Sequence, residues 1–157
     1  LFPFSENPLE RERATEPYEV RGGNETILVA EDDEQLRNLT VSILSEFGYR
    51  IIEAVDGEDA VRKFFRHRDS VQLILLDAIM PRKSGKEAYL EITAAKPSVK
   101  ALFFSGYDID IIGSKGLLVE GVPVLLKPAA PTDLMRAVRK ALDATDAIPP
   151  GHTPART

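Results

Sequence analysis

Apolar residues along the chain fall into two alternating patterns. Short runs rich in β-branched and aromatic residues are typical of buried strands, and longer stretches with an apolar residue every three or four positions are typical of amphipathic helices. Five runs of the first kind occur, at residues 26–30, 50–54, 71–76, 100–105 and 122–126. Each is followed by a stretch of the second kind, so the pattern predicts five strand–helix units.

Local signals mark several of the predicted helices. Asp56 can cap the second helix, and Ser84 with Glu87 fits a capping box at the start of the third. The fourth helical stretch, residues 108–118, has a glycine inside it, which weakens its helical pattern. The first helix is predicted from apolar residues at three- and four-residue spacings, namely Leu36, Leu39, Ile43, Leu44 and Phe47.

The alternation of strands and helices predicts an α/β fold with a parallel sheet covered on both faces. The predicted strands are almost wholly apolar, as central parallel strands are. Ligands of such folds bind beyond the carboxyl ends of the strands, near a switch in strand order. The residues that follow the strands are therefore the candidates for a functional site.

Polar residues stand where four of the five predicted strands end. They are Glu31, Asp32 and Asp33 after the first strand, Asp77 after the third, Ser105 at the end of the fourth and Lys127 after the fifth. Right-handed crossovers place the carboxyl ends of parallel strands along one edge of the sheet. We therefore expect the fold to gather carboxylates, a hydroxyl and an ammonium group into one patch.

This set of groups suits phosphoryl chemistry that depends on a divalent cation. Carboxylates that lie close together repel one another and respond by protonating or by binding a cation. Oxygen ligands without histidine or cysteine favour Mg²⁺ or Mn²⁺. An aspartate can be the nucleophile in phosphoryl transfer, and a hydroxyl and an ammonium group can hold the phosphoryl oxygens. Asp77 is the candidate nucleophile, with Ser105 and Lys127 opposite it.

Each of these residues also has a structural interpretation when it is taken alone. Asp77 could cap a turn or a helix, and the acidic run at Glu31 could be a favourable helix start. Ser105 could belong to a simple turn, and Lys127 could be a solvated loop residue. Because all four features occur at the strand ends that such a site requires, we favour the functional interpretation.

Composition narrows the class of protein. The 157 residues are 43% hydrophobic and 29% charged, which is ordinary for a soluble domain, and the formal net charge of −5 argues against a dedicated nucleic-acid-binding protein. The absence of cysteine excludes disulfides and thiolate metal sites. No apolar run approaches the roughly 20 residues of a membrane-spanning helix. The N-terminal residues lack the pattern of a signal peptide, so a cytoplasmic location is expected.

Four motifs resemble the receiver domain of two-component response regulators. They are ILVAEDDEQLR at residues 27–37, LILLDAIMPRKSG at 73–85, LFFSGYD at 102–108 and LLKP at 125–128. The resemblance covers residues 25–144, which we expect to form one receiver domain. It implies a flavodoxin-like, doubly wound fold of five strand–helix units, with the strands in the order 2-1-3-4-5.

The resemblance also implies a phosphoacceptor role. Asp77 would accept a phosphoryl group from a phosphohistidine on a histidine kinase or a histidine phosphotransfer domain. Ser105 would donate a hydrogen bond to the phosphoryl group, and Lys127 would pair with it. Such a domain catalyses its own phosphorylation and is not a turnover enzyme by itself.

A magnesium site is implied beside the phosphoacceptor. Asp32 and Asp77 would bind Mg²⁺ directly, and Glu31 would act mainly through a bound water. The backbone carbonyl of Ile79 would complete the set of ligands. Asp33 is the next residue into the helix and is not expected to be a ligand.

The sequence departs from the family pattern in the fifth unit. Val124 stands three positions before Lys127, where the family usually has an aromatic residue that couples to the hydroxyl of the fourth strand, so the usual rotamer switch is expected to be absent or altered. Ala129 and Ala130 stand where the family often has an aromatic residue and a capping Thr or Ser. The last helix should therefore begin without a side-chain cap, a loss of roughly 1 kcal/mol.

The two ends of the chain are predicted to lie outside the domain. Residues 1–24 carry three prolines and dense charge and are predicted to be a linker or N-terminal arm, and residues 145–157 a flexible tail. The arm is similar to the junction before the C-terminal receiver of hybrid sensor kinases, so the chain could be a fragment of a hybrid histidine kinase or a stand-alone regulator. We expect partner or homodimer contacts around residues 107–122, and no contact with nucleic acid or membrane.

Three other functions stay open beside the phosphoacceptor. A pseudo-receiver would bind a partner without phosphorylation, and Val124 leaves room for it. A phosphatase with an aspartyl nucleophile would need a general acid two residues after Asp77, where Ile79 stands. A flavodoxin-like cofactor binder is disfavoured, because acidic strand ends would repel a phosphate group.

Overall fold

The computed structural model describes residues 21–144. Most of the predicted N-terminal arm, residues 1–20, and the whole predicted tail, residues 145–157, lie outside the described residues. Within residues 21–144, no helix combines the length and the apolar character that crossing a bilayer requires.

Five strands and five helices alternate along the described residues. The strands are β2 (Thr26–Ala30), β3 (Arg50–Ala54), β4 (Val71–Asp77), β5 (Lys100–Ser105) and β6 (Val124–Leu126). The helices are α2 (Glu34–Glu46), α3 (Gly57–Arg66), α4 (Gly85–Ala95), α5 (Ile109–Ser114) and α6 (Pro131–Asp143).

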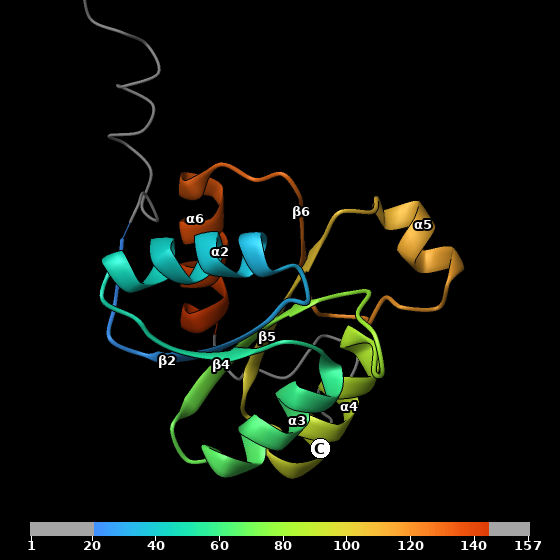
Figure 1. Cartoon of the computed structure of the whole chain (residues 1–157), viewed down its shortest axis with the longest axis horizontal. Helices are drawn as coiled ribbons and strands as arrows, with labels where there is room; N and C mark the ends of the chain where they lie inside the picture. The colour runs from blue at the N-terminus through green and yellow to red at the C-terminus, as the bar shows by residue number, and fades with distance from the viewer. Residues whose placement is uncertain (1–20, 145–157) are drawn as a thin grey trace, which may run out of the picture.

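The strands form one sheet in which every neighbouring pair is parallel. Their spatial order is β3-β2-β4-β5-β6. Counted from the first strand of the chain this order is 2-1-3-4-5, so the predicted topology is confirmed. Figure 1 shows α2 and α6 over one face of the sheet and α3 and α4 over the other, which gives the two-sided cover that the apolar strands require.

The core consists of two clusters, one on each face of the sheet, because successive strand residues point to opposite faces. On one face, Leu28, Ile74 and Phe103 pack with Phe64 of α3 and Ile92 of α4. On the other face, the alternate strand residues pack against α2 and α6, in a cluster that includes Ile27, Leu75, Leu102, Leu44 and Val138.

Helix starts agree with the capping signals in the sequence. The Asp56 carboxylate accepts a hydrogen bond from the Asp59 N–H at 2.7 Å at the start of α3. Ser84 and Glu87 form both hydrogen bonds of the capping box at the start of α4. Helix α6 starts at a proline after Ala130, without a side-chain cap, as its sequence predicts.

Two elements differ from the sequence-based expectation. Leu39 of α2 is 57% exposed, because it lies about 100° round the helix from the buried Thr40 and so leaves the core-facing side. Strand β6 begins at Val124 instead of residue 122. Pro123 still accepts a hydrogen bond from the Phe103 N–H at 3.0 Å, but proline has no N–H to continue the ladder.

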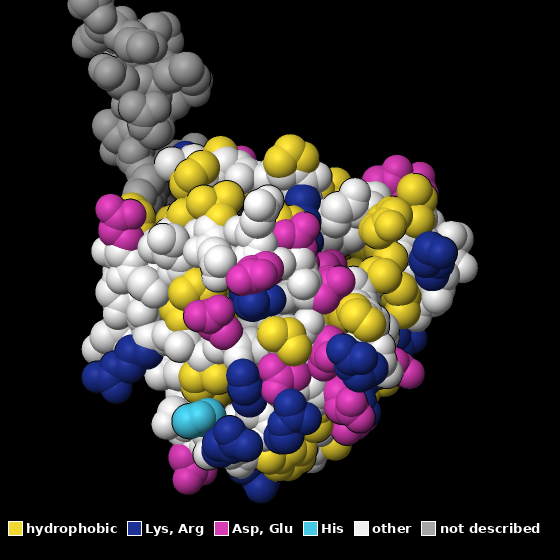
Figure 2. Space-filling view, viewed as in Figure 1, with side chains coloured by type: hydrophobic (Ala, Val, Ile, Leu, Met, Phe, Trp, Pro, Cys, Tyr) yellow, Lys and Arg dark blue, Asp and Glu magenta, His cyan; other side chains and the backbone are white. Residues whose placement is uncertain are grey.

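The face beside α5 keeps large apolar side chains in solvent. Tyr107, Ile109 and Ile111 are 48%, 46% and 41% exposed, and Leu126 of the neighbouring edge strand β6 is 41% exposed. Figure 2 shows hydrophobic side chains gathered over α5. Helix α5 has only six residues, so this apolar surface is carried by fewer than two helical turns.

Gly85 lets the start of α4 approach the end of β4 closely. A Cβ atom at Gly85 would lie 2.4 Å from the Asp77 carbonyl oxygen and 3.1 Å from the Ala78 Cα atom. Both neighbours are backbone atoms, which cannot turn aside as a side chain can. The backbone that carries Asp77 is therefore held directly by the first residue of α4.

We predict that Gly85→Ala lowers the free energy of unfolding by about 1–3 kcal/mol, measured by urea denaturation, because the clash outweighs the gain in helix propensity. The matched control is Gly106→Ala, whose Cβ would meet only the Lys127 side chain, at 4.0 Å. The control should change stability by less than about 0.5 kcal/mol. Equal effects of the two substitutions would contradict the close approach at Gly85.

Candidate functional site

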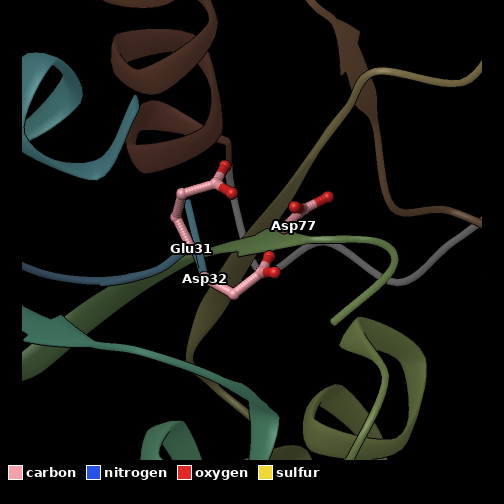
Figure 3. Close-up of side chains that lie close together, drawn as sticks. All are labelled: Glu31, Asp32 and Asp77. Atoms are coloured by element: carbon pink, nitrogen blue, oxygen red, sulfur yellow. The ribbon is translucent and has the colours of Figure 1, made fainter. Parts of the chain in front are cut away.

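The register of the sheet brings the acidic residues together. Ala30, the last residue of β2, pairs with Leu76 of β4, so the residues that follow, Glu31 and Asp77, stand side by side. Glu31, Asp32 and Asp77 each offer a carboxylate oxygen, and these oxygens all lie within 4.8 Å of one another. Figure 3 shows the three carboxylates grouped beyond the ends of β2 and β4. The predicted gathering of carboxylates is therefore present.

Lys127 reaches the same cluster from the far side of β5. The Lys127 Nζ lies 2.5 Å from Glu31 Oε1 and 3.3 Å from Asp77 Oδ2. Its backbone N–H donates to the Ser105 carbonyl at 2.7 Å, which fixes the chain just after β6. The ammonium also lies 5.2 Å from the centre of the Phe104 ring, a favourable position for a cation that is largely removed from water.

Asp77 is buried, with 9% of its surface exposed. Burial disfavours its charged form and, with the nearby Glu31 carboxylate, raises the pKa of Asp77 to about 7, although the Lys127 charge and the Ile79 N–H oppose the rise. The pKa of Lys127 is shifted as well. Burial disfavours the charged ammonium, but the hydrogen bond to Glu31 and the Asp77 charge raise the pKa of Lys127 above its ordinary value.

The three consecutive acidic residues after β2 have separate positions. Glu31 is 5% exposed, and its Oε2 accepts a hydrogen bond from the Asp33 N–H at 3.1 Å. Asp32 is exposed and shares the cluster with Asp77. Asp33 caps α2 by accepting from the Leu36 N–H at 3.0 Å. Asp33 thus belongs to the helix start and lies outside the three-carboxylate group.

The two remaining candidates lie at the edge of the cluster. Ser105 is fully buried, and its hydroxyl donates to the Tyr107 carbonyl and accepts from the Tyr107 N–H, both at 3.0 Å. Ile79 is half-buried, and its N–H donates to Asp77 Oδ1 at 3.4 Å. The structure therefore brings Glu31, Asp32, Asp77 and Lys127 together, while the Ser105 hydroxyl is engaged by its own loop.

Sequence reasoning did not identify two arginines that support the site. Arg37 donates to the Glu31 carbonyl oxygen at 2.9 Å and so holds the turn between β2 and α2. Arg82, in the loop after Asp77, has a φ of 69° and donates to the Asp56 carboxylate at 2.6 Å. Arg37 and Glu31 are six positions apart, across the turn into α2, so helical periodicity does not predict this contact. No sequence signal predicts the contact between Arg82 and Asp56. The contact involves a left-handed backbone conformation at Arg82, and that conformation is normally expected at glycine.

The donor set fits a hard divalent cation such as Mg²⁺ or Mn²⁺. Its three members are carboxylates, and no histidine or cysteine lies among them. Burial, with a smaller contribution from the Glu31 charge, raises the pKa of Asp77, so its ionised form is not fully stabilised by Lys127. A cation of this kind would stabilise that form.

Comparison with known proteins agrees with the motifs. The family model for the response regulator receiver domain matches residues 27–139. Among curated relatives, the transcriptional regulatory protein CssR of Bacillus subtilis is 33% identical over 117 residues, which cover 74% of this chain and 51% of CssR. The sensor kinase CckA of Brucella abortus is 26% identical over 136 residues, which cover 87% of this chain and 14% of that kinase.

Solved structures show the same fold. The crystal structure of the receiver domain from the hybrid histidine kinase CckA is 27% identical and superposes with a TM-score of 0.64, covering 74% of this chain and 98% of that domain. This chain spans about half the length of the first curated relatives that it matches. The similarity therefore concerns one domain of larger proteins.

We predict that Asp77→Asn stabilises the metal-free protein at alkaline pH. The folded-state pKa of about 7 is above the ordinary value of 3.8, so the folded protein binds more protons than the unfolded chain between these values. Stability therefore falls as pH rises through this window, and asparagine removes that loss. The stability difference between variant and wild type should grow from near zero at about pH 4 to on the order of 4 kcal/mol at about pH 8, measured by urea denaturation. A difference that does not depend on pH would contradict the charged cluster.

Proposed function

The chain belongs to the response regulator receiver domain family, and we propose that it accepts a phosphoryl group on Asp77 and so acts as a switch or relay in a two-component His–Asp system. The observation that carries this proposal is the buried Asp77 carboxylate, with Glu31 and Asp32 within 4.8 Å and the Lys127 ammonium at 3.3 Å. A nucleophilic carboxylate, further acidic ligands and one cation are the groups that acyl phosphate formation requires.

The proposed reaction is an in-line transfer from a phosphohistidine. A carboxylate oxygen of Asp77 forms a bond to phosphorus, and the bond from phosphorus to the imidazole nitrogen breaks. The electron pair of that bond returns to the imidazole, which is left neutral once it has taken up a proton. Lys127, already beside Asp77, pairs with the phosphoryl oxygens as a point charge.

Ser105 takes part by turning its hydroxyl. In the unphosphorylated protein this hydroxyl bonds to the backbone of Tyr107. A hydrogen bond to the phosphoryl group replaces the bond to the Tyr107 carbonyl. The loop between β5 and α5 would then rearrange, so phosphorylation would be communicated to the α5 face.

Mg²⁺ or Mn²⁺ is the proposed cofactor. Asp32 and Asp77 are the proposed direct side-chain ligands, Glu31 would act mainly through a bound water, and the Ile79 carbonyl would complete the site. The bound cation supplies positive charge that balances the carboxylates and the phosphoryl oxygens. Lys127 favours the ionised, nucleophilic form of Asp77, because its charge opposes the effect of burial on the Asp77 pKa.

The proposed partners are a histidine kinase or a histidine phosphotransfer domain, which would supply the phosphohistidine. A hybrid histidine kinase context is supported by the likeness to CckA, because the 136 aligned residues extend beyond the part matched by the family model. We also propose a cytoplasmic location, because two-component receivers meet their phosphodonors there.

A partner or homodimer contact is proposed for the face formed by α5 and β6. Tyr107, Ile109, Ile111 and Leu126 expose large apolar surface there. The Ser105 loop adjoins this face, so its rearrangement on phosphorylation would alter the surface that a partner meets.

One alternative has an observation in its favour. A pseudo-receiver that binds its partner without phosphorylation is compatible with the Ser105 hydroxyl bonded to the Tyr107 backbone and with Val124 in place of an aromatic residue. An aspartyl phosphatase is disfavoured, because Ile79 cannot protonate a leaving group.

The experiment that tests the proposal is intact mass spectrometry after incubation with a small-molecule phosphodonor. We expect one phosphoryl adduct in the presence of Mg²⁺ and none after the metal is chelated. Asp77→Asn should abolish the adduct, and Asp33→Asn should retain it, because Asp33 caps α2 and lies outside the cluster. Failure of the folded wild type to form an adduct would favour the pseudo-receiver. An adduct that survives Asp77→Asn would show that the acceptor is a different residue.

A further inference from the structure

A second buried charge cluster lies at the far end of α6 from Lys127. The Arg139 side chain is only 9% exposed. Its guanidinium donates to both carboxylate oxygens of Glu25, at 3.1 and 2.7 Å, and to Asp143 at 2.8 Å. It also donates to the Tyr49 hydroxyl and to the Gly22 carbonyl oxygen, both at 3.2 Å. These contacts join α6 to the segment that enters β2.

The entering segment, residues 21–25, is fitted closely against α2 and α6. The Gly23 N–H donates to the Phe47 carbonyl at 3.2 Å, and Arg21 pairs with Asp143 at 2.5 Å. A Cβ atom at Gly22 would lie 2.1 Å from the Phe47 carbonyl oxygen, and one at Gly23 would lie 2.5 Å from the Arg139 guanidinium. The packing thus requires glycine at position 22, where the close neighbour is backbone, whereas a side chain at position 23 would displace the side chains of the Arg139 cluster.

The cluster is held by charge as well as by shape. Arg139 lowers the pKa of Glu25 and of Asp143 by hydrogen bonding to both carboxylates. Loss of Arg139 would leave the Glu25 carboxylate, whose side chain is only 18% exposed, without the guanidinium that bonds to both its oxygens, which is destabilising. Arg139 is therefore the residue on which the joint depends.

We propose that Arg139 clamps residues 21–25 to α6, so that the segment entering the domain and α6 move as one body. Helix α6 begins four residues after Lys127, at Pro131, and has no side-chain cap to fix its first turn. A shift of Lys127 toward a phosphoryl group would therefore displace α6, and the clamp would pass that displacement to the chain that precedes residue 21. This second step rests on the proposed function, whereas the clamp itself does not.

The clamp is tested by ¹⁵N NMR relaxation of Gly22 and Gly23. In the wild type both amides should have the order parameters of a rigid backbone, about 0.85, and Arg139→Met should lower them to about 0.6 or below. Gly23→Ala should disturb the contact between Arg139 and residues 21–25 from the side of that segment, and so lower the order parameter of the Gly22 amide. The matched control is Lys140→Met, a basic residue next along the same helix that is exposed. Unchanged order of both glycines in Arg139→Met would overturn the clamp.

The transmission is tested by chemical shift changes of the same two amides when the protein is phosphorylated. We expect shifts at Gly22 and Gly23 in the wild type and in Lys140→Met, and none in Arg139→Met, while intact mass shows that all three proteins are phosphorylated. Phosphorylated wild type without shifts at these glycines would overturn transmission and leave the proposed function standing. Shifts that persist in Arg139→Met would also overturn it. No adduct in any protein would refute the proposed function, and the relaxation data would still decide the clamp.

Discussion

The interaction on which the site depends is the attraction between the Lys127 ammonium and the carboxylates of Glu31 and Asp77. The strand register forces these carboxylates together: Ala30 pairs with Leu76, and the next residue of each strand is acidic. Burial then works against their charge, which raises the pKa of Asp77 to about 7. One buried lysine balances part of the negative charge of the carboxylates, and a divalent cation would balance the remainder. In the proposed function, that cation and Lys127 would also offset the charge of a phosphoryl group on Asp77.

Helix α6 lies between the Lys127 cluster and the Arg139 cluster. Lys127 stands just before its start, and Arg139 stands in its last turns. The start has no side-chain cap, while the end is tied by Glu25, Asp143 and Tyr49. Under this proposal, α6 connects Lys127, which would respond to phosphorylation, with Arg139, which holds residues 21–25.

Much of this architecture follows from local patterns in the sequence. Apolar runs at strand spacing and caps at Asp56 and Ser84 predict the strand–helix alternation, and the polar residues at the strand ends predict the carboxylate cluster. Contacts between distant residues are harder to foresee. The bond between Arg82 and Asp56, the engagement of Ser105 by Tyr107 and the Arg139 cluster depend on side-chain placement in three dimensions. Leu39 shows the limit of periodicity, because its spacing fits a helix while its side chain faces solvent.

The titration of the Asp77 carboxyl group, followed by ¹³C NMR in the metal-free protein, tests this account most directly. We expect a midpoint of about 7, far above the ordinary value of 3.8. Lys127→Met should raise the midpoint, because a stabilising positive charge is lost, and Glu31→Gln should lower it, because a repelling negative charge is lost. A midpoint near the ordinary value, unmoved by either substitution, would contradict the claim that Asp77, Glu31 and Lys127 form one electrostatic unit.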